Sequence, residues 1–283
     1  MIQTFFICFK SDLKYLIKNV LKNIFGINVQ RITKAETKIR SKVSVRKIKN
    51  MIIHKGFAVS DGQASWFYTA YERGDHDPLT NFALDFILNN VNKDSNILVT
   101  GCGTGIMAFY LADNGYKKVS GFDYLQECVD VANEISVLGD YAIKFYQDDG
   151  FNPELGDKQY DLITAMHWVF SAWMGNYGNK KLPNDKAFSN EFRESVLIDF
   201  LGKYATHLNK GGMMILELTD AVTDYRIPTD HYLGEYSKEI YPIRHTPEQV
   251  SKCAGLLNME IIHRNISVSY GQHPRTQYVL KKL

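Results

Sequence analysis

Short apolar runs alternate with segments of helical spacing over residues 77–283. Short runs rich in apolar residues, several of which end in glycine or an acid, predict strands. The predicted strands are 97–100, 118–123, 142–147, 160–166, 209–217, 259–264 and 276–281. Thr246-Pro247-Glu248-Gln249 predicts a helix start, with Pro at the first helical position. This alternation is typical of a mostly parallel sheet with helices on both faces.

The first predicted strand leads directly into glycines at alternate positions, Gly101, Gly103 and Gly105. A turn without Cβ atoms lets the backbone approach a ligand closely, and the free N–H groups of the following helix face the same point. A dinucleotide fingerprint would place its third glycine one position later, where Ile106 stands. The spacing therefore argues against a dinucleotide, although glycine turns also end strands for structural reasons alone.

Acidic residues end the next two predicted strands. Asp123 lies 18 residues beyond Gly105, where a carboxylate can accept both hydroxyls of a ribose. The third strand ends in Asp148-Asp149-Gly150, and Met166 ends the fourth. Ligands of such sheets bind beyond the carboxyl ends of the strands, so these positions are expected to meet at one edge.

In this order, the glycine turn, the two acids and the later strands resemble class I (Rossmann-like) S-adenosylmethionine-dependent methyltransferases. The resemblance implies an α/β, doubly wound fold with a mostly parallel seven-stranded sheet and an antiparallel C-terminal strand. It implies S-adenosylmethionine as the cofactor and an acid that accepts from the adenine amine, for which spacing favours Asp149 over Asp148. The implied cofactor-binding residues are Gly101, Cys102, Gly103, Gly105, Asp123, Tyr124, Asp149, Gly150, Met166 and Tyr68.

The segment from Ser60 to Tyr71 carries several aromatic residues ahead of the first strand. In the family, a helical segment at this place often covers the cofactor pocket, and aromatic faces attract a sulfonium cation. Trp66, Tyr68 and Tyr71 are therefore candidate pocket walls. The alternative is that they are core residues of that helix.

His167 is the candidate catalytic residue. The loop after the fourth strand points at the methyl group in this fold, and His167 is the only ionisable residue of its stretch Met166–Phe170. Imidazole suits a base that takes the proton of a hydroxyl acceptor. The alternative is a histidine that packs beside the cofactor or bonds to backbone. His76 and His231 are weaker candidates.

Two stretches, 171–189 and 219–245, exceed the minimal fold and mix aromatic residues with Asn, Asp, His and Arg. Long loops of this kind usually bind ligands, and this mixture suits a polyhydroxylated or charged small acceptor. The chain lacks the Asn/Asp-Pro-Pro-aromatic motif, the paired-glutamate loop and the metal-binding acid cluster of other methyltransferase groups, and we expect no metal. We expect O-methylation of a sugar or sugar-linked group. Methylation of another small metabolite, and a non-catalytic cofactor-binding partner protein, stay open.

Charge divides the chain into a basic arm, residues 1–55, and a methyltransferase domain, residues 56–283. The arm holds 13 Lys/Arg and two acids, and the remainder holds 20 Lys/Arg and 29 acids. Lys10, Lys14, Lys18 and Lys22 form one helical stripe opposite apolar residues, a pattern typical of a helix on an anionic membrane surface. Packing on the core or on a partner is the alternative, and the acidic domain disfavours nucleic acid.

Residues 34–49 predict a solvated helix or linker. The arm resembles methyltransferases of bacterial surface-polysaccharide clusters, through Ile24-Phe25-Gly26-Ile27 and its basic flanks. Four scattered cysteines without metal spacing indicate a reducing compartment. With no secretory signal and no transmembrane run, we expect a cytoplasmic protein, with membrane contact through residues 1–25 at the inner surface.

Overall fold

The computed structural model describes residues 41–57, 60–68, 71, 78–166, 189–219, 229–230, 239–240, 244–267 and 275–283. The predicted lysine stripe, the three candidate histidines His76, His167 and His231, and most of both insertions lie outside these ranges. The side chains of residues 66–68 also lie outside the description.

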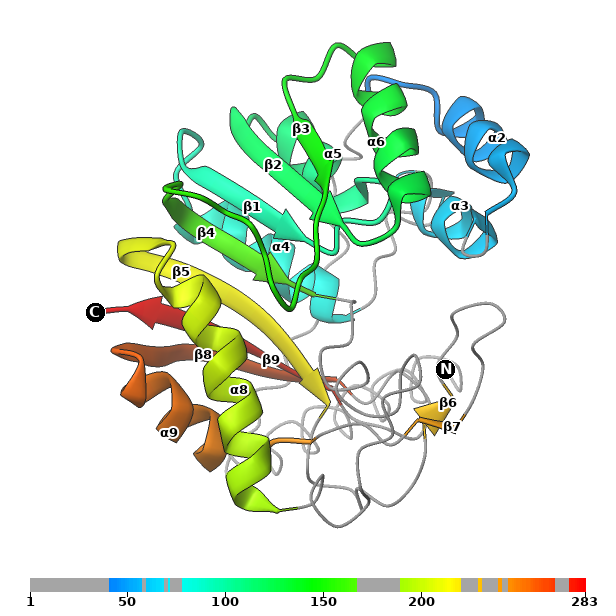
Figure 1. Ribbon diagram of the computed structural model, residues 1–283. Helices are drawn as coiled ribbons and strands as arrows, with labels where there is room; N and C mark the ends of the chain where they lie inside the picture. Colours follow the sequence, from blue (N-terminus) through cyan, green and yellow to red (C-terminus); the bar gives the residue numbers. More distant parts are fainter. Residues whose placement is uncertain are drawn as a thin grey trace, which may run out of the picture. The chain divides into compact units, whose positions relative to one another are not determined.

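Seven helices and nine strands lie in the described ranges (Figure 1). The helices are α2 (Val45–Lys55), α3 (Ser60–Tyr68), α4 (Pro78–Asn90), α5 (Ile106–Asp113), α6 (Gln126–Leu138), α8 (Asn190–Ala205) and α9 (Pro247–Leu256). The strands are β1 (Asn96–Thr100), β2 (Lys118–Asp123), β3 (Lys144–Gln147), β4 (Tyr160–Ala165), β5 (Leu208–Thr219), β6 (Thr229–Asp230), β7 (Glu239–Ile240), β8 (Met259–Ser267) and β9 (Arg275–Lys282).

Seven of the strands form one sheet in the order β3-β2-β1-β4-β5-β9-β8, and β6 pairs with β7 separately. Strands β1 to β5 are mutually parallel. Strand β9 is antiparallel to both of its neighbours, β5 and β8. The predicted mostly parallel, seven-stranded sheet with an antiparallel C-terminal strand is confirmed.

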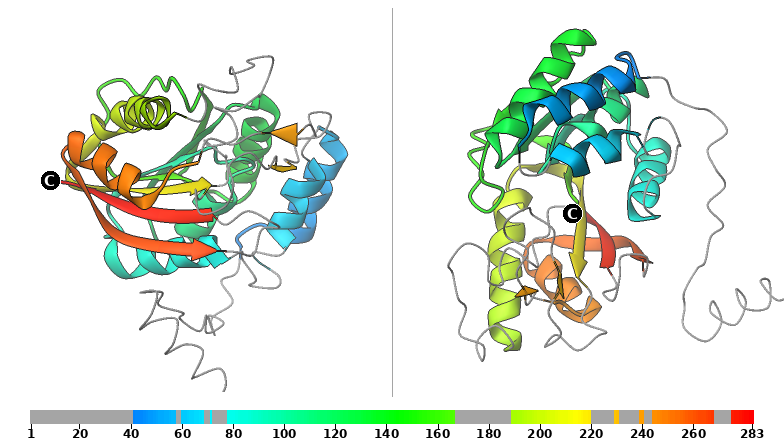
Figure 2. Two further views of the ribbon diagram at one scale, coloured as in Figure 1. Left: turned by 90° about the horizontal axis from the view of Figure 1, so that it is seen from below. Right: turned by 90° about the vertical axis from the view of Figure 1, so that its right-hand side faces the viewer.

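Both faces of the sheet are covered, as Figures 1 and 2 show. Side chains alternate between the faces, so that Ile97 and Val99 of β1 enter the core beneath α4, α5 and α6, whereas Leu98 enters the core beneath α8 and α9. Burial on both faces explains why the central strands are continuous apolar runs in the sequence. The carboxyl ends of β1 to β5 all meet at one edge, because these strands are parallel.

Helix α2 corrects the expectation for residues 34–49. Val45, Ile48 and Ile52 are buried in the core beneath α4, α5 and α6, and Lys55 reaches Glu134 of α6 at 2.9 Å. The helix belongs to the compact unit that extends from residue 37 to residue 283. The segment is rich in lysine, but Ile48 and Ile52 are spaced i, i+4 and form one buried stripe. From Val45 onward the segment is therefore neither a solvated helix nor a linker.

No helix in the described part of the chain is long and apolar enough to cross a membrane. Cys102, Cys128 and Cys253 are buried free thiols.

Candidate functional site

The glycine turn joins β1 to α5 with a backbone that only glycine adopts easily. Gly101, Gly103 and Gly105 have φ angles of 58°, 54° and 90°, the left-handed region that a Cβ disfavours. The N–H of Cys102 donates to the carbonyl of Phe122 at 2.9 Å, which fastens the turn to β2. No side chain caps the helix that begins after Gly105, so its first N–H groups are available to a ligand.

Gly105 is required by packing as well as by its backbone angle. A Cβ at this position would lie 2.7 Å from the ring of Phe109 and 2.9 Å from the ring of Phe145. These contacts are shorter than side chains tolerate. The third glycine therefore lets two aromatic rings close against the start of α5.

Asp123 lies at the end of β2 and binds the glycine turn directly. Its Oδ2 accepts the N–H of Gly103 at 2.7 Å, and its Oδ1 accepts the N–H of Leu125 at 3.0 Å. Burial raises the pKa of this carboxyl, and the backbone donors oppose that effect. Each carboxylate oxygen keeps a further lone pair, so Asp123 fits a ligand that offers two hydroxyls.

The loop after β3 places both acids of the predicted adenine site at the same edge. Asp148 accepts the N–H groups of Asp149 and Glu154, at 2.8 and 3.0 Å, and burial raises its pKa. The hydroxyl of Tyr204 on α8 donates to the carbonyl of Gly150 at 2.6 Å, which fixes the loop. Asp149 accepts the N–H of Phe151 at 2.9 Å and the amide of Asn152 at 3.2 Å. Both acids therefore organise this loop, and the preference for Asp149 at the adenine stays a prediction.

Met166 and Tyr124 complete the candidate cofactor residues that the structure describes. Met166 is buried directly after β4, and Gln277 of β9 donates to its sulfur at 3.7 Å. Tyr124 follows β2, and its side chain is 59% exposed. An exposed aromatic ring next to Asp123 has a flat face that can stack against a base.

The strand order arranges these residues in a row. Along the carboxyl edge, β3, β2, β1 and β4 present Asp149, Asp123, the glycine turn and Met166 in that sequence (Figure 1). Neighbouring strands lie about 4.8 Å apart. The edge therefore offers an extended ligand successive contacts from four strands.

Gln63 of α3 is a site residue that sequence reasoning missed. Its Oε1 accepts both the backbone N–H of Thr104, at 3.1 Å, and the hydroxyl of Thr104, at 2.9 Å. Gln63 is only 8% exposed, and a Cβ on Gly103 would lie 2.7 Å from its amide. Helix α3 thus contacts the glycine turn through the side-chain amide of Gln63. No local sequence motif marks this glutamine as a site residue.

Tyr71 is a core residue and not a pocket wall. Its hydroxyl donates to Asp113 of α5 at 3.1 Å, and burial raises its pKa well above the usual value. Trp66 and Tyr68 keep their predicted role as candidate walls, untested because their side chains are not described.

Cys102 is a small buried residue of the turn. Burial raises the pKa of its thiol well above the ordinary value, and the nearby Asp123 adds to this effect. A raised pKa disfavours a thiolate at this position.

Polar side chains extend the site beyond Met166 toward β5 and β9. Glu217, with a side chain 5% exposed, forms an ion pair with Arg275 at 2.7 Å, and Thr276 and Gln277 beside them are fully buried. All four lie near the carboxyl end of β5, because β9 runs antiparallel to it. These residues carry no sequence motif, because Glu217 stands between two leucines and the polar start of β9 meets it only through strand pairing.

A second polar cluster joins the starts of α8 and α9. Arg193 donates to the carbonyl of Arg244 at 3.1 Å, and His245 Nε2 lies 2.9 Å from the carbonyl of Arg193. Burial lowers the pKa of His245 to about 4, so this histidine is neutral near neutral pH. The cluster fixes both helices where the two long insertions begin or end.

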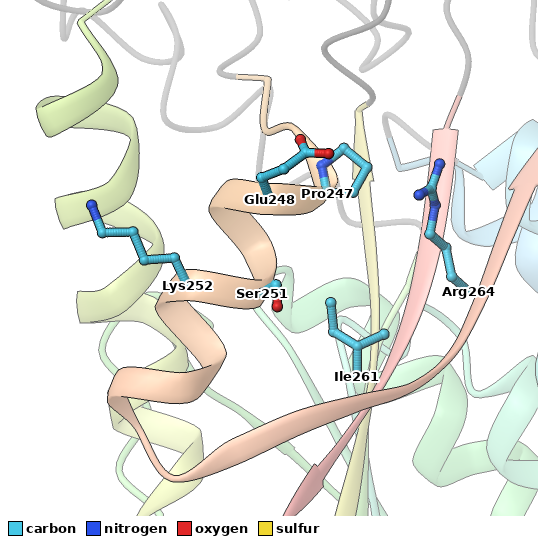
Figure 3. Close-up of a pocket in the computed structure, with 6 residues that line it drawn as sticks. All are labelled: Pro247, Glu248, Ser251, Lys252, Ile261 and Arg264. Atoms are coloured by element: carbon cyan, nitrogen blue, oxygen red, sulfur yellow. The ribbon is translucent and has the colours of Figure 1, made fainter.

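A surface pocket between α9 and β8 lies outside the row of strand-end residues (Figure 3). It is lined by Pro247, Glu248, Ser251, Lys252, Ile261 and Arg264. Thr246 and Gln249 cap the start of α9 reciprocally, and Lys252 pairs with Glu194 at 2.6 Å. Of the lining residues, Lys252 is already held in an ion pair, and none of the six belongs to the row of strand-end residues. In the described ranges, no cluster of His, Cys, Asp and Glu could hold a metal ion.

Solved methyltransferases share this fold. A S-adenosylmethionine-dependent methyltransferase from Clostridium acetobutylicum superposes with a TM-score of 0.54 at 16% identity, over 78% of this chain and 98% of that one. The magnesium protoporphyrin IX methyltransferase of Synechocystis, solved with bound S-adenosylhomocysteine, gives 0.52 at 13% identity, over 95% and 100%. The fold is that of class I methyltransferases.

The sequence itself matches the family model of a methyltransferase domain over residues 97–177. That segment contains the glycine turn and both acid loops. Ribosomal protein L11 methyltransferase of Thiobacillus denitrificans is 29% identical over 96 residues, 34% of this chain and 31% of that protein. The match thus spans about a third of this relative. Fold and domain match together support a class I S-adenosylmethionine-dependent methyltransferase, and S-adenosylmethionine is the cofactor that the edge residues fit.

Proposed function

We propose that this protein uses S-adenosylmethionine to O-methylate a sugar or sugar-linked group in bacterial glycan biosynthesis. The row formed by Asp149, Asp123, the glycine turn and Met166 carries the methyltransferase part of the proposal. It offers an acid to the adenine, an acid to the ribose and free helix N–H groups beyond them. When bound there, the cofactor supplies an activated methyl group.

The polar residues beside Met166 support a polyhydroxylated acceptor. Glu217, Arg275, Thr276 and Gln277 combine a carboxylate, a guanidinium, a hydroxyl and an amide near the carboxyl end of β5. Sugars are recognised by such mixed donors and acceptors, since each hydroxyl both donates and accepts.

The acceptor hydroxyl needs a base in this scheme. The oxygen would form the new bond to the methyl carbon as the carbon–sulfur bond of bound S-adenosylmethionine breaks, with S-adenosylhomocysteine as the leaving group. The hydroxyl proton passes to the base, for which His167 is our candidate. Alignment and exclusion of water are the other tasks of the site.

Product formation tests the proposal. Purified protein is incubated with S-adenosylmethionine and with matched sets of nucleotide sugars, oligosaccharides and small amines, and S-adenosylhomocysteine release is measured. We expect release only with sugar-containing acceptors. Release with amines alone would overturn the acceptor class, and tight cofactor binding without release for any acceptor would favour a non-catalytic binding protein.

His167→Asn tests the base. Asparagine keeps polarity but cannot take the proton, so turnover should fall by about two to four decades, the usual contribution of general-base catalysis. Cofactor affinity should stay unchanged, because the adenosyl contacts lie elsewhere. Wild-type turnover in this variant would remove His167 from the mechanism, and His76 and His231 would be tested next.

We also propose that the lysine stripe binds the inner, cytoplasmic membrane surface, close to membrane-linked glycans. The full-length protein in which Lys10, Lys14, Lys18 and Lys22 are replaced by Gln should bind anionic vesicles less than the wild type. Binding of the wild type should weaken with salt, because the attraction is electrostatic. Salt-insensitive binding, or equal binding by both proteins, would contradict this role.

A further inference from the structure

The amide of Gln63 uses only its oxygen in the contact with the glycine turn. Both groups that reach it, the N–H and the hydroxyl of Thr104, meet the oxygen Oε1 at 3.1 and 2.9 Å. A backbone N–H can only donate, so it fixes which end of the amide is oxygen. The nitrogen Nε2 is thereby directed away from Thr104, and no described residue accepts a hydrogen bond from it.

The position of this donor matches the far end of the cofactor. With adenine at Asp149 and ribose at Asp123, the rest of the molecule must continue along the row past β2. The next strand in that direction is β1, which ends in the glycine turn. The Nε2 atom lies 2.7 Å from where a Cβ of Gly103 would stand, so the donor is at the surface of that turn. A cofactor bound in this order would bring its amino-acid end, with its carboxylate, to Gln63.

We propose that Nε2 of Gln63 donates a hydrogen bond to the carboxylate of S-adenosylmethionine and so positions the methionine end of the cofactor. The assignment rests on the proposed function. It adds a contact from α3, which lies outside the matched domain of residues 97–177. A hydrogen bond to a charged group in a nearly buried position is stronger than one between neutral groups.

The consequence is selectivity for ligands that carry an amino-acid end. Gln63→Glu keeps an oxygen for Thr104 but replaces the donor by a negative charge, which repels a carboxylate. By calorimetry, the variant should bind S-adenosylmethionine and S-adenosylhomocysteine about 10- to 100-fold more weakly. Its affinity for 5′-methylthioadenosine, which has no amino-acid end, should change less than about twofold.

A matched control is Gln249→Glu. Gln249 is a second buried glutamine, with its oxygen on the N–H of Thr246 at 3.0 Å and its nitrogen on Asn190 at 3.1 Å. It lies in the start of α9, away from the glycine turn. Binding of all three ligands by this variant should match the wild type.

The measurement that decides the outcome is the ratio of the affinities for S-adenosylhomocysteine and methylthioadenosine. A substitution that merely distorts the glycine turn should weaken the binding of both ligands to the same extent, and it would leave this ratio unchanged. Gln63→Lys, which supplies a charged donor, should keep this ratio at or above the wild-type value even where the turn is weakened. Equal losses of both ligands in Gln63→Glu, or no loss, would overturn the assignment to the carboxylate. If the wild type binds none of the three ligands, the proposed function fails.

Discussion

At the scale of single residues, the site depends on groups that serve the fold and the ligand together. Asp123 closes the glycine turn through Gly103 and faces the expected ribose position with its remaining lone pairs. Glycines and strand-end acids can be found from sequence, because their spacing along one βαβ unit is regular. Gln63 and Tyr204 cannot be found from sequence in this way. Their partners, Thr104 and Gly150, lie 41 and 54 residues away along the chain.

Asp123→Ala should weaken the binding of S-adenosylmethionine. The ribose loses its acceptor and the N–H of Gly103 loses its partner, so we expect a loss of about 1–3 kcal/mol in binding free energy by calorimetry. Asp130→Ala is the control, because Asp130 is an exposed residue of α6 whose carboxylate accepts from Gln126, away from the strand-end row. An unchanged affinity in Asp123→Ala would mean that this acid does not hold the ribose.

Gly105→Ala should lower the free energy of unfolding by more than backbone strain alone. The left-handed backbone costs an L residue about 1–2 kcal/mol, and the close approach to Phe109 and Phe145 adds about 1–3 kcal/mol of overpacking. Gly156→Ala measures the backbone strain alone, because Gly156 has a φ of 58° but no atom within 4 Å of where its Cβ would stand. Denaturant unfolding that gives equal losses for both variants would contradict the packing role.

At the scale of elements, the strands followed from the apolar runs with small differences at their ends. Strand β3 begins at Lys144, two residues later than predicted, because its pairing with β2 starts there. Strands β5 and β8 extend further than predicted, since their pairs with β9 continue to Arg275. Strand ends depend on the partner strand, which the local pattern does not contain. The prediction of a solvated helix or linker was wrong for α2, because it was based on the helix's many basic residues and not on its two buried isoleucines, Ile48 and Ile52.

Ile48→Ala should test how much α2 contributes to the fold. Ile48 is fully buried, and its truncation should lower the free energy of unfolding by about 2–5 kcal/mol. Ile53→Ala on the same helix should cost less than about 1 kcal/mol, because Ile53 is 43% exposed. Similar small losses in denaturant unfolding for both variants would show that α2 is dispensable.

At the scale of the whole molecule, His245 should make stability depend on pH. Burial lowers its pKa to about 4, while an unfolded histidine has a pKa near 6.5. Between these values the unfolded chain binds more protons, so stability falls as pH falls from about 6.5 to 4. The full effect is about 3 kcal/mol.

His245→Gln should remove this part of the pH dependence. The half-buried carboxyls Asp113 and Asp148, whose pKa values desolvation raises, act in the opposite direction in both proteins. The measurement is therefore the difference between wild type and variant in the free energy of unfolding, followed from pH 7 to pH 4. Parallel curves would show that His245 is not the group responsible.

The sheet order also dictates when the molecule can be completed during synthesis. Strand β9 lies between β5 and β8, yet it leaves the ribosome after both of them. Until it arrives, the cofactor half β3-β2-β1-β4 can already assemble, while β5 and β8 expose unpaired edges to the cell. We therefore expect a stage of synthesis at which the strands of the nucleotide-binding half can pair while β8 has no partner, and an unpaired strand of this kind is prone to aggregate or to be bound by chaperones.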